Sequence, residues 1–311
     1  MRRVTFSQKV KEELVNLEME DNEQASLWLC SALAASGLFR AGEVYIKSAQ
    51  RAFIEKLQLE VRRLWDIEAS VGEKTAYAYL TISGQAQVQI VRQEMLAHLH
   101  YNTLRGTLER QAGSFAPALR LTALRSIFLA AGSLAEPASS YQIEFALRRL
   151  SVANFVEELL ELEDIEILRL QHGAYHMLYI KNGDQIAQLL ANGGAHMSYL
   201  QFEQIRVRKN MNGMVNRTVN CDSANSQRVA DTSARQIELL RDLDAANGVD
   251  KLPDDLRVVA RLRLDNPGFS IREMGECMDP PLGKSGMYHR LGKLEVWAKN
   301  YLAELGEDSG T

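Results

Sequence analysis

The sequence predicts an α+β fold for its first two thirds and an all-α fold for the remainder. Helical and strand-like patterns alternate up to about residue 200, and their order occurs twice. Beyond residue 230 only helical patterns remain. The chain has 311 residues, which is long for one hydrophobic core and sufficient for two domains.

Composition excludes several classes of protein. Hydrophobic residues make up 46% and charged residues 24%, both typical of a soluble globular protein. Cys30, Cys221 and Cys277 form no C-x-x-C pair, which indicates free thiols in a reducing compartment and no zinc site. No secretory signal and no run of roughly 18 apolar residues is present. We therefore expect a cytoplasmic protein without a metal, a cofactor, a membrane partner or an evident small-molecule substrate.

The elements of the first repeat follow from their periodicity. Apolar and small residues predict a fully buried helix, and alternating pairs such as Val44/Ile46 predict strands. The expected order is a buried helix over 25–37, a strand over 43–50, a helix over 51–67, a strand over 76–83 and a helix over 85–100. Tyr77 and Tyr79 could line an open sheet face, although strand aromatics more often belong to the core.

The second repeat has the same order. It starts with a small-residue helix over 121–134, followed by a strand over 141–149, a helix over 151–165, a strand over 174–181 and a helix over 184–193. Gly37 and Gly132 end the two small-residue helices, which should pack against each other because small side chains let backbones approach. We predict a domain over 1–205 with αββ-type repeats at about 20–110 and 115–200.

Residues 206–230 differ from both flanks because they are polar, rich in asparagine and basic. Residues 206–235 contain six Arg or Lys residues against Asp222 and Asp231. This composition predicts a connector, and its basic residues indicate an anionic partner that binds at or near it. The side chains of Asn216, Asn220 and Asn225 could order the connector or contact phosphates, and ordering is the favoured interpretation.

The last part, over 231–305, has the pattern of a helix-turn-helix domain, with the motif at about 269–301. Asn266-Pro267-Gly268 ends one helix, and Ser270 with Glu273 forms a capping box for the next. A third helix should start near Lys284 or Ser285. The residues expected on its buried seam are Met287, Leu291, Leu294 and Ala298.

The outer side of this third helix has the chemistry for contacting DNA. Arg can donate two hydrogen bonds to a guanine edge, while Lys, Ser and helix-start amides can bind phosphate. The candidate DNA-binding residues are Ser270, Arg272, Lys284, Ser285, Tyr288, His289, Arg290 and Lys293, with Arg217 and Arg228 from the connector. The same three-helix pattern also fits a protein-docking domain.

Several motifs together resemble the WhiA family of bacterial DNA-binding regulators. They are NRTVNCDSAN at 216–225, Gln236, Leu252-Pro253, the KSG…HR residues Lys284 to Arg290, RSIFLAAGSL at 125–134 and FSQKVKEEL at 6–14. The resemblance is weak over about 40–115. It implies a LAGLIDADG homing-endonuclease-like N-terminal fold and a helix-turn-helix similar to sigma-factor region 4. It also implies double-stranded DNA as partner, a nucleoid location and roles in transcription, cell division, chromosome segregation and, in some bacteria, sporulation.

An active homing endonuclease of that fold has an acidic residue near the end of each small-residue helix. Such paired carboxylates hold divalent metal ions. Here the corresponding residues are Ser36 and Ala131, and Glu43 and Glu136 lie beyond the helix ends at unequal offsets. We therefore expect no enzymatic activity. A metal-dependent nuclease and a scaffold that docks RNA polymerase or a co-regulator are the alternatives.

Overall fold

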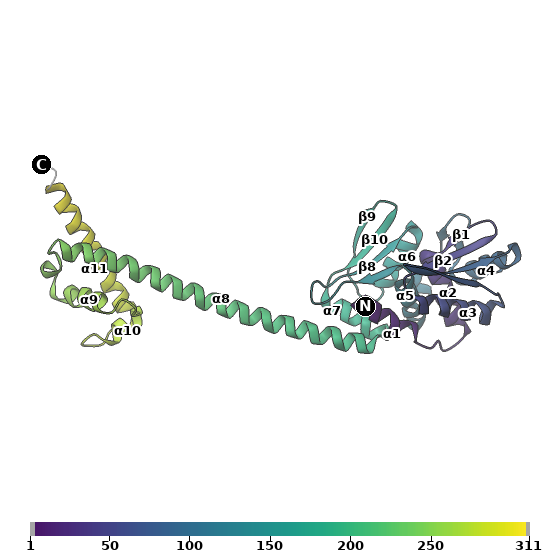
Figure 1. The fold of residues 1–311 in the computed structure, drawn as a ribbon, viewed down its shortest axis with the longest axis horizontal. Coiled ribbons are helices and arrows are strands. Elements are labelled where there is room, and N and C mark those ends of the chain that lie inside the picture. Colours follow the sequence, from purple (N-terminus) through teal and green to yellow (C-terminus); the bar gives the residue numbers. More distant parts are fainter. Residues whose placement is uncertain (1–3, 309–311) are drawn as a thin grey trace. The chain divides into compact units, whose positions relative to one another are not determined.

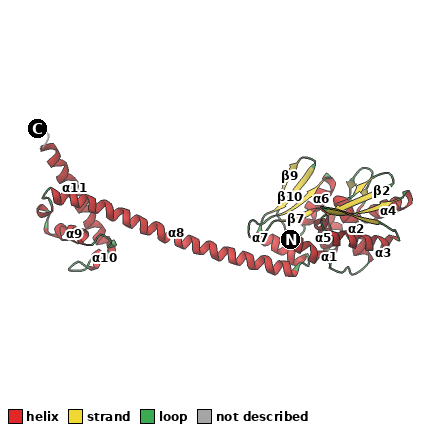
Figure 2. Ribbon diagram, in the orientation of Figure 1, coloured by secondary structure: helices red, strands yellow, loops and turns green. Residues whose placement is uncertain are grey.

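The computed structural model describes residues 4–308 and divides into two compact units, one ending at Asn210 and one beginning at Met211. The first unit contains helices and three antiparallel sheets, whereas the second is entirely helical (Figures 1 and 2). Among residues 4–308, no helix is both long and apolar enough to cross a bilayer.

The first unit contains the two predicted repeats. The first comprises α2 (Asn22–Ser36), β1 (Leu38–Phe39), β2 (Glu43–Ser48), α3 (Arg51–Trp65), β3 (Ser70–Lys74), β4 (Tyr77–Ser83) and α4 (Gln85–Leu99). The second comprises α5 (Pro117–Ala131), β7 (Gly132–Leu134), β8 (Ile143–Leu147), α6 (Leu150–Glu161), β9 (Leu168–His172), β10 (Tyr175–Ile180) and α7 (Gly183–Asn192). A hairpin of β5 (Tyr101–Asn102) and β6 (Thr107–Leu108) and a short helix η1 (Ala112–Ser114) separate them.

The two large sheets have equivalent strand orders, β1-β2-β4-β3 and β7-β8-β10-β9. In the first sheet, Ile46 of β2 pairs with Leu80 of β4, and both side chains are buried. The alternate residues Tyr77 and Tyr79 are only half-buried because successive strand side chains point to opposite faces. These tyrosines therefore line the open face, and the preference for a core position was wrong.

Helices α2 and α5 pack against each other, as predicted (Figure 1). Their contact includes a hydrogen bond from the buried Ser126 hydroxyl of α5 to the backbone carbonyl of Trp28 in α2. Gly37 and Gly132 follow the last residues of the two helices. A Cβ at Gly37 would lie 2.4 Å from the Leu33 carbonyl oxygen, so this helix end has no room for a side chain.

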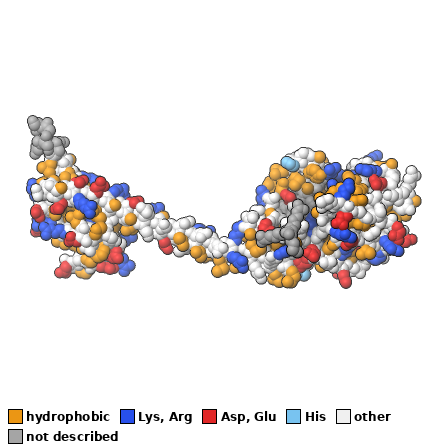
Figure 3. Space-filling view, viewed as in Figure 1, with side chains coloured by type: hydrophobic (Ala, Val, Ile, Leu, Met, Phe, Trp, Pro, Cys, Tyr) orange, Lys and Arg blue, Asp and Glu red, His pale blue; other side chains and the backbone are white. Residues whose placement is uncertain are grey.

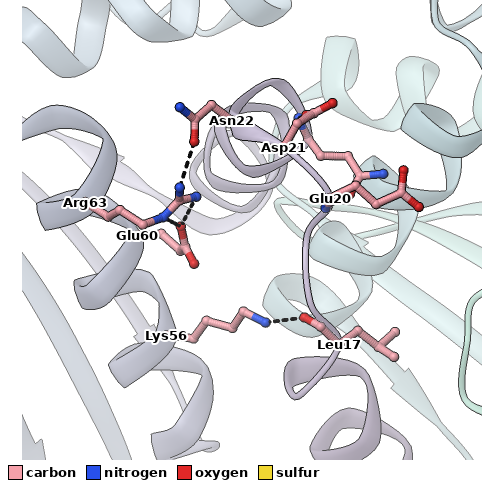
Figure 4. Close-up of polar contacts among 8 residues, drawn as sticks. Leu17, Glu20, Asp21, Asn22, Lys56, Glu60 and Arg63 are labelled. Carbon is pink, nitrogen blue, oxygen red and sulfur yellow. Dashed lines mark hydrogen bonds and ion pairs between the residues drawn. The ribbon is translucent and has the colours of Figure 1, made fainter.

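An N-terminal helix, α1 (Phe6–Val15), is attached to both repeats. Lys56 of α3 donates hydrogen bonds to the carbonyls of Val15 and Leu17, at 2.6 and 2.5 Å, which satisfies the C-terminal end of α1. Figure 4 shows the bond to Leu17. In the same region, Arg63 donates to Asn22 at 2.7 Å and forms an ion pair with Glu60 (Figure 4). These contacts fix the segment between α1 and α2 on α3.

Lys11 of α1 gives the first unit a predictable dependence on pH. Its ammonium donates to the Leu129 carbonyl at 3.1 Å, and burial lowers the pKa of Lys11 to about 8. Between about pH 8 and 10 the unfolded chain binds a proton that the folded chain has released, so raising the pH stabilises the fold. We expect wild type to gain up to about 1.4 kcal/mol per pH unit relative to Lys11→Met in urea titrations. A constant difference between the two proteins would contradict this.

Residues 206–230 belong to a continuous helix, α8 (His196–Ala245). The prediction of a connector ordered by asparagine side chains is not supported. Asn216, Asn220 and Asn225 are exposed, and none of their side chains has a hydrogen-bond partner among the residues that the structure describes. The helical backbone hydrogen bonds order this segment instead.

The second unit contains the C-terminal part of α8, a short helix η2 (Val249–Lys251), α9 (Asp254–Asp265), α10 (Ile271–Glu276) and α11 (Lys284–Asp308). Its core combines residues from all of the longer helices, including Leu243 of α8, Val259 of α9, Met274 of α10 and Met287 of α11. This core holds α11 in place, so it positions the candidate DNA-contacting face.

Candidate nucleic-acid interface

The predicted capping box at the start of α10 is present. The Ser270 hydroxyl accepts a hydrogen bond from the Glu273 amide at 3.3 Å, and the Glu273 carboxylate accepts from the Ser270 amide at 2.7 Å. These bonds to the charged form lower the pKa of the Glu273 carboxyl group. The Ser270 hydroxyl thus has a structural partner, and α10 has a defined start.

The turn between α10 and α11 closes tightly over Gly275. The Leu282 amide donates to the Gly275 carbonyl at 2.9 Å, and a Cβ at Gly275 would lie 2.3 Å from the Leu282 carbonyl oxygen. A side chain at this position would therefore push the turn away from α10. The turn determines where α11 begins, and α11 begins at Lys284 as predicted.

The predicted buried seam of α11 is confirmed. Met287, Leu291, Leu294 and Ala298 are all buried in the core of the second unit. Burial at i, i+4, i+7 and i+11 fixes the rotation of the helix about its axis. The opposite side of its first three turns must therefore face solvent.

That outer side carries the residues predicted to contact DNA. Lys284, Ser285, Tyr288, His289 and Lys293 are exposed, and Tyr288 reaches an exposure of 68%. Lys and Arg side chains are visible on the surface of this unit in Figure 3. The structure therefore brings together two cations, a hydroxyl, an aromatic ring and an imidazole over about three turns of one helix.

The remaining predicted residues lie elsewhere. Arg290 is half-buried at the margin of the face, and Arg272 on α10 forms an ion pair with Glu276 at 2.9 Å. Arg217 and Arg228 are exposed on α8, and no hydrogen bond or ion pair between described residues joins them to the α11 face.

A buried arginine stabilises the helix-turn-helix unit that carries the interface. Its role was not predicted from the sequence. Arg263 of α9 is only 2% exposed and donates to the Phe269 carbonyl at 2.6 Å and the Ser233 hydroxyl at 3.3 Å. Burial lowers the pKa of its guanidinium. Arg263 therefore joins α8 and α9 to the loop before α10. Its position in the apolar series Leu256, Val259, Ala260 was the signal that could have identified it.

The ends of α2 and α5 carry the residues expected in place of metal ligands. Ser36 and Ala131 are the last residues of these helices, and neither side chain supplies a carboxylate. The nearby carboxylates have other partners, because Glu43 forms an ion pair with Arg40 at 3.1 Å and Glu136 accepts from the Phe6 amide at 3.4 Å.

Comparison with known proteins connects both units to one family. A family model for the WhiA C-terminal HTH domain matches residues 215–298, and a model for the WhiA LAGLIDADG-like domain matches residues 121–212. This chain belongs to the WhiA family. Its N-terminal unit accordingly has a LAGLIDADG-like fold and its C-terminal unit a helix-turn-helix fold.

The relatives of this WhiA-family chain cover from about half to nearly all of its length. A probable cell division protein WhiA from Clostridium tetani is 29% identical over 97% of this chain and 99% of the relative. Another from Clostridium beijerinckii is 39% identical over 57% of this chain and 56% of the relative. The crystal structure of full-length DUF199/WhiA from Thermatoga maritima is 26% identical, with a TM-score of 0.58 over 95% of this chain and 98% of that chain.

Proposed function

We propose that this protein is a non-enzymatic, sequence-specific DNA-binding regulator of transcription that acts in cell division. The observation that carries the proposal is the exposed face of α11, which the core of the second unit holds in a fixed rotation. The relatives' name, cell division protein, supports the cellular role. Chromosome segregation, sporulation and a nucleoid location in the cytoplasm belong to the same proposal.

The start of α11 would enter the major groove of double-stranded DNA. Lys284 and Lys293 would bind phosphates on either side, while Ser285 and His289 would contact base edges between them. The free amides of the first turn add hydrogen-bond donors toward phosphate. Half-buried Arg290 and Arg272, which has a carboxylate partner, would contribute less than the outermost side chains.

The chemistry of the helix ends supports the proposed absence of nuclease activity. Divalent metal ions in phosphodiester hydrolysis require charged oxygen ligands. A hydroxyl at Ser36 and a methyl group at Ala131 provide no such charge. The LAGLIDADG-like unit would then serve as a binding platform.

A second candidate function is docking to the transcription machinery. A shallow hollow continues from the α11 face and is lined by Leu256, Trp297 and the 60% exposed Val296. These apolar groups do not match phosphate and would fit a protein such as an RNA polymerase subunit or a co-regulator.

A gel-shift titration of the full chain on bacterial promoter DNA, across a salt series with Mg²⁺ present, tests the proposal. We expect binding that weakens steeply with salt and DNA that stays uncut. Cleaved DNA would establish a nuclease. Failure to bind at low salt would favour the protein-docking function.

A further inference from the structure

Helix α8 carries a row of apolar side chains that are exposed to solvent. Met197, Leu200, Val207, Met211 and Met214 are 72%, 52%, 56%, 62% and 63% exposed. Their spacing alternates between three and four residues once the exposed Gln204 is included. Continued by Thr218 and Cys221, this spacing is the heptad pattern of a coiled coil. We call these eight positions the α8 seam.

The α8 seam lies opposite the side of the helix that packs on the first unit. Ser198 and Phe202 are buried, and by the helical period they lie across the axis from Met197, Leu200 and Gln204. The seam stays exposed where the helix is attached, although its first positions, Met197, Leu200 and Gln204, border a groove whose other wall is α1. Hydrophobic side chains are visible along α8 in Figure 3.

The sequence of α8 is poorly suited to a helix that stands alone. Asn212, Gly213, Asn216 and Asn220 all have low helix propensity. Helices of such composition obtain most of their stability from packing an apolar face. The unpacked seam coincides with this weak segment, so a partner on the seam would supply the missing stabilisation.

We propose that the α8 seam pairs in parallel with the α8 seam of a second copy of this chain. In a parallel two-stranded coiled coil, the residue just before the first seam position of each heptad (Met197, Gln204, Met211 or Thr218) meets the residue five places later in the other helix. This register places Glu203 opposite Arg208 of the second copy, and Arg217 opposite Asp222 of the second copy. Both pairs have opposite charges, and symmetry repeats each of them. The pattern thus selects a second copy as the occupant.

The side chains involved are available for this pairing. Arg208, Arg217 and Asp222 are exposed. Glu203 bonds Arg206 within the same helix at 2.5 Å, but Arg206 also pairs with Asp184 and keeps that partner if Glu203 turns away. Parallel pairing also brings two helix-turn-helix units to the same end of the coiled coil, which suits a DNA site with two half-sites. The pairing itself does not depend on DNA binding.

Sedimentation velocity of the full chain, at concentrations up to roughly 100 µM, tests the pairing. We expect a reversible dimer whose dissociation constant rises at least about tenfold in Met211→Lys, since a seam lysine must lose its hydration. Asn212→Lys is the matched control, because it adds the same charge to the neighbouring exposed position outside the seam. A wild-type chain that stays monomeric, or an equal effect of both variants, would overturn the proposal.

Charge reversal and cross-linking test the parallel register. Arg217→Asp should weaken the dimer, and the double variant R217D/D222R should restore it.

In a Cys277→Ser background, copper phenanthroline and air should oxidise two Cys221 thiols to an inter-chain disulfide, because paired seam positions lie within disulfide reach. Adding Cys221→Ser should abolish that product. A dimer that forms without the Cys221 cross-link would overturn the parallel arrangement, and binding only to a different protein would overturn the choice of a second copy.

Discussion

Replacing both Lys284 and Lys293 with alanine is expected to weaken binding to promoter DNA by about 10- to 100-fold at physiological salt. Both ammonium groups are exposed on the first three turns of α11, where they flank Ser285 and His289. Each lost phosphate contact should also reduce the slope of log affinity against log salt by about one. Gel-shift or fluorescence-anisotropy titrations at several salt concentrations measure both quantities.

The matched control is the double variant R241A/K299A. It removes the same charge from the second unit at two exposed positions, one on α8 and one on the last part of α11, outside the proposed contact face. We expect its salt slope to stay close to wild type. Equal losses in the two double variants would show that net charge alone, and no defined face, governs binding.

Replacing Arg263 with alanine should destabilise the second unit by about 3 kcal/mol. The substitution removes a side chain that is only 2% exposed. The Phe269 carbonyl and the Ser233 hydroxyl then lose the hydrogen bonds that the Arg263 guanidinium donates to them. Because these bonds hold the loop before α10, DNA binding should be lost at temperatures where wild type still binds. Thermal unfolding followed by circular dichroism measures the stability loss.

Arg261→Ala provides the comparison on the same helix. Arg261 is exposed and pairs with the exposed Asp250 at 3.2 Å. Surface ion pairs contribute little, so its loss should cost less than about 1 kcal/mol. Similar effects of the two substitutions would contradict the role assigned to Arg263.

The helices of the motif were predictable because the local sequence pattern and the packing in the core both favour a helix at the same residues. The seam from Met287 to Ala298 has a clear helical period, and Ser270 with Glu273 marks the start of α10 through side chains that bond locally. The helix ends at Gly37 and Gly132 were predictable for a similar reason, since both glycines close a small-residue segment.

The missed elements depend on partners that are distant in sequence. Strand β3 (SVGEK) has no apolar alternation, and it is ordered by pairing with β4 at the edge of the sheet. Residues 211–230 of α8 are almost all exposed and are rich in asparagine, so local preference disfavours the helix that forms. Arg263 resembled a surface residue because its partners, Phe269 and Ser233, come from outside its helix.

We propose that the outermost side chains of α11 read a DNA sequence. The most direct test measures the affinity of full-length wild type and of the double variant S285A/H289A for a selected promoter duplex and for a scrambled duplex of equal length. We expect wild type to prefer the promoter, and the variant to lose most of this preference while keeping its affinity for the scrambled duplex. An unchanged preference in the variant would show that Ser285 and His289 do not read the DNA sequence.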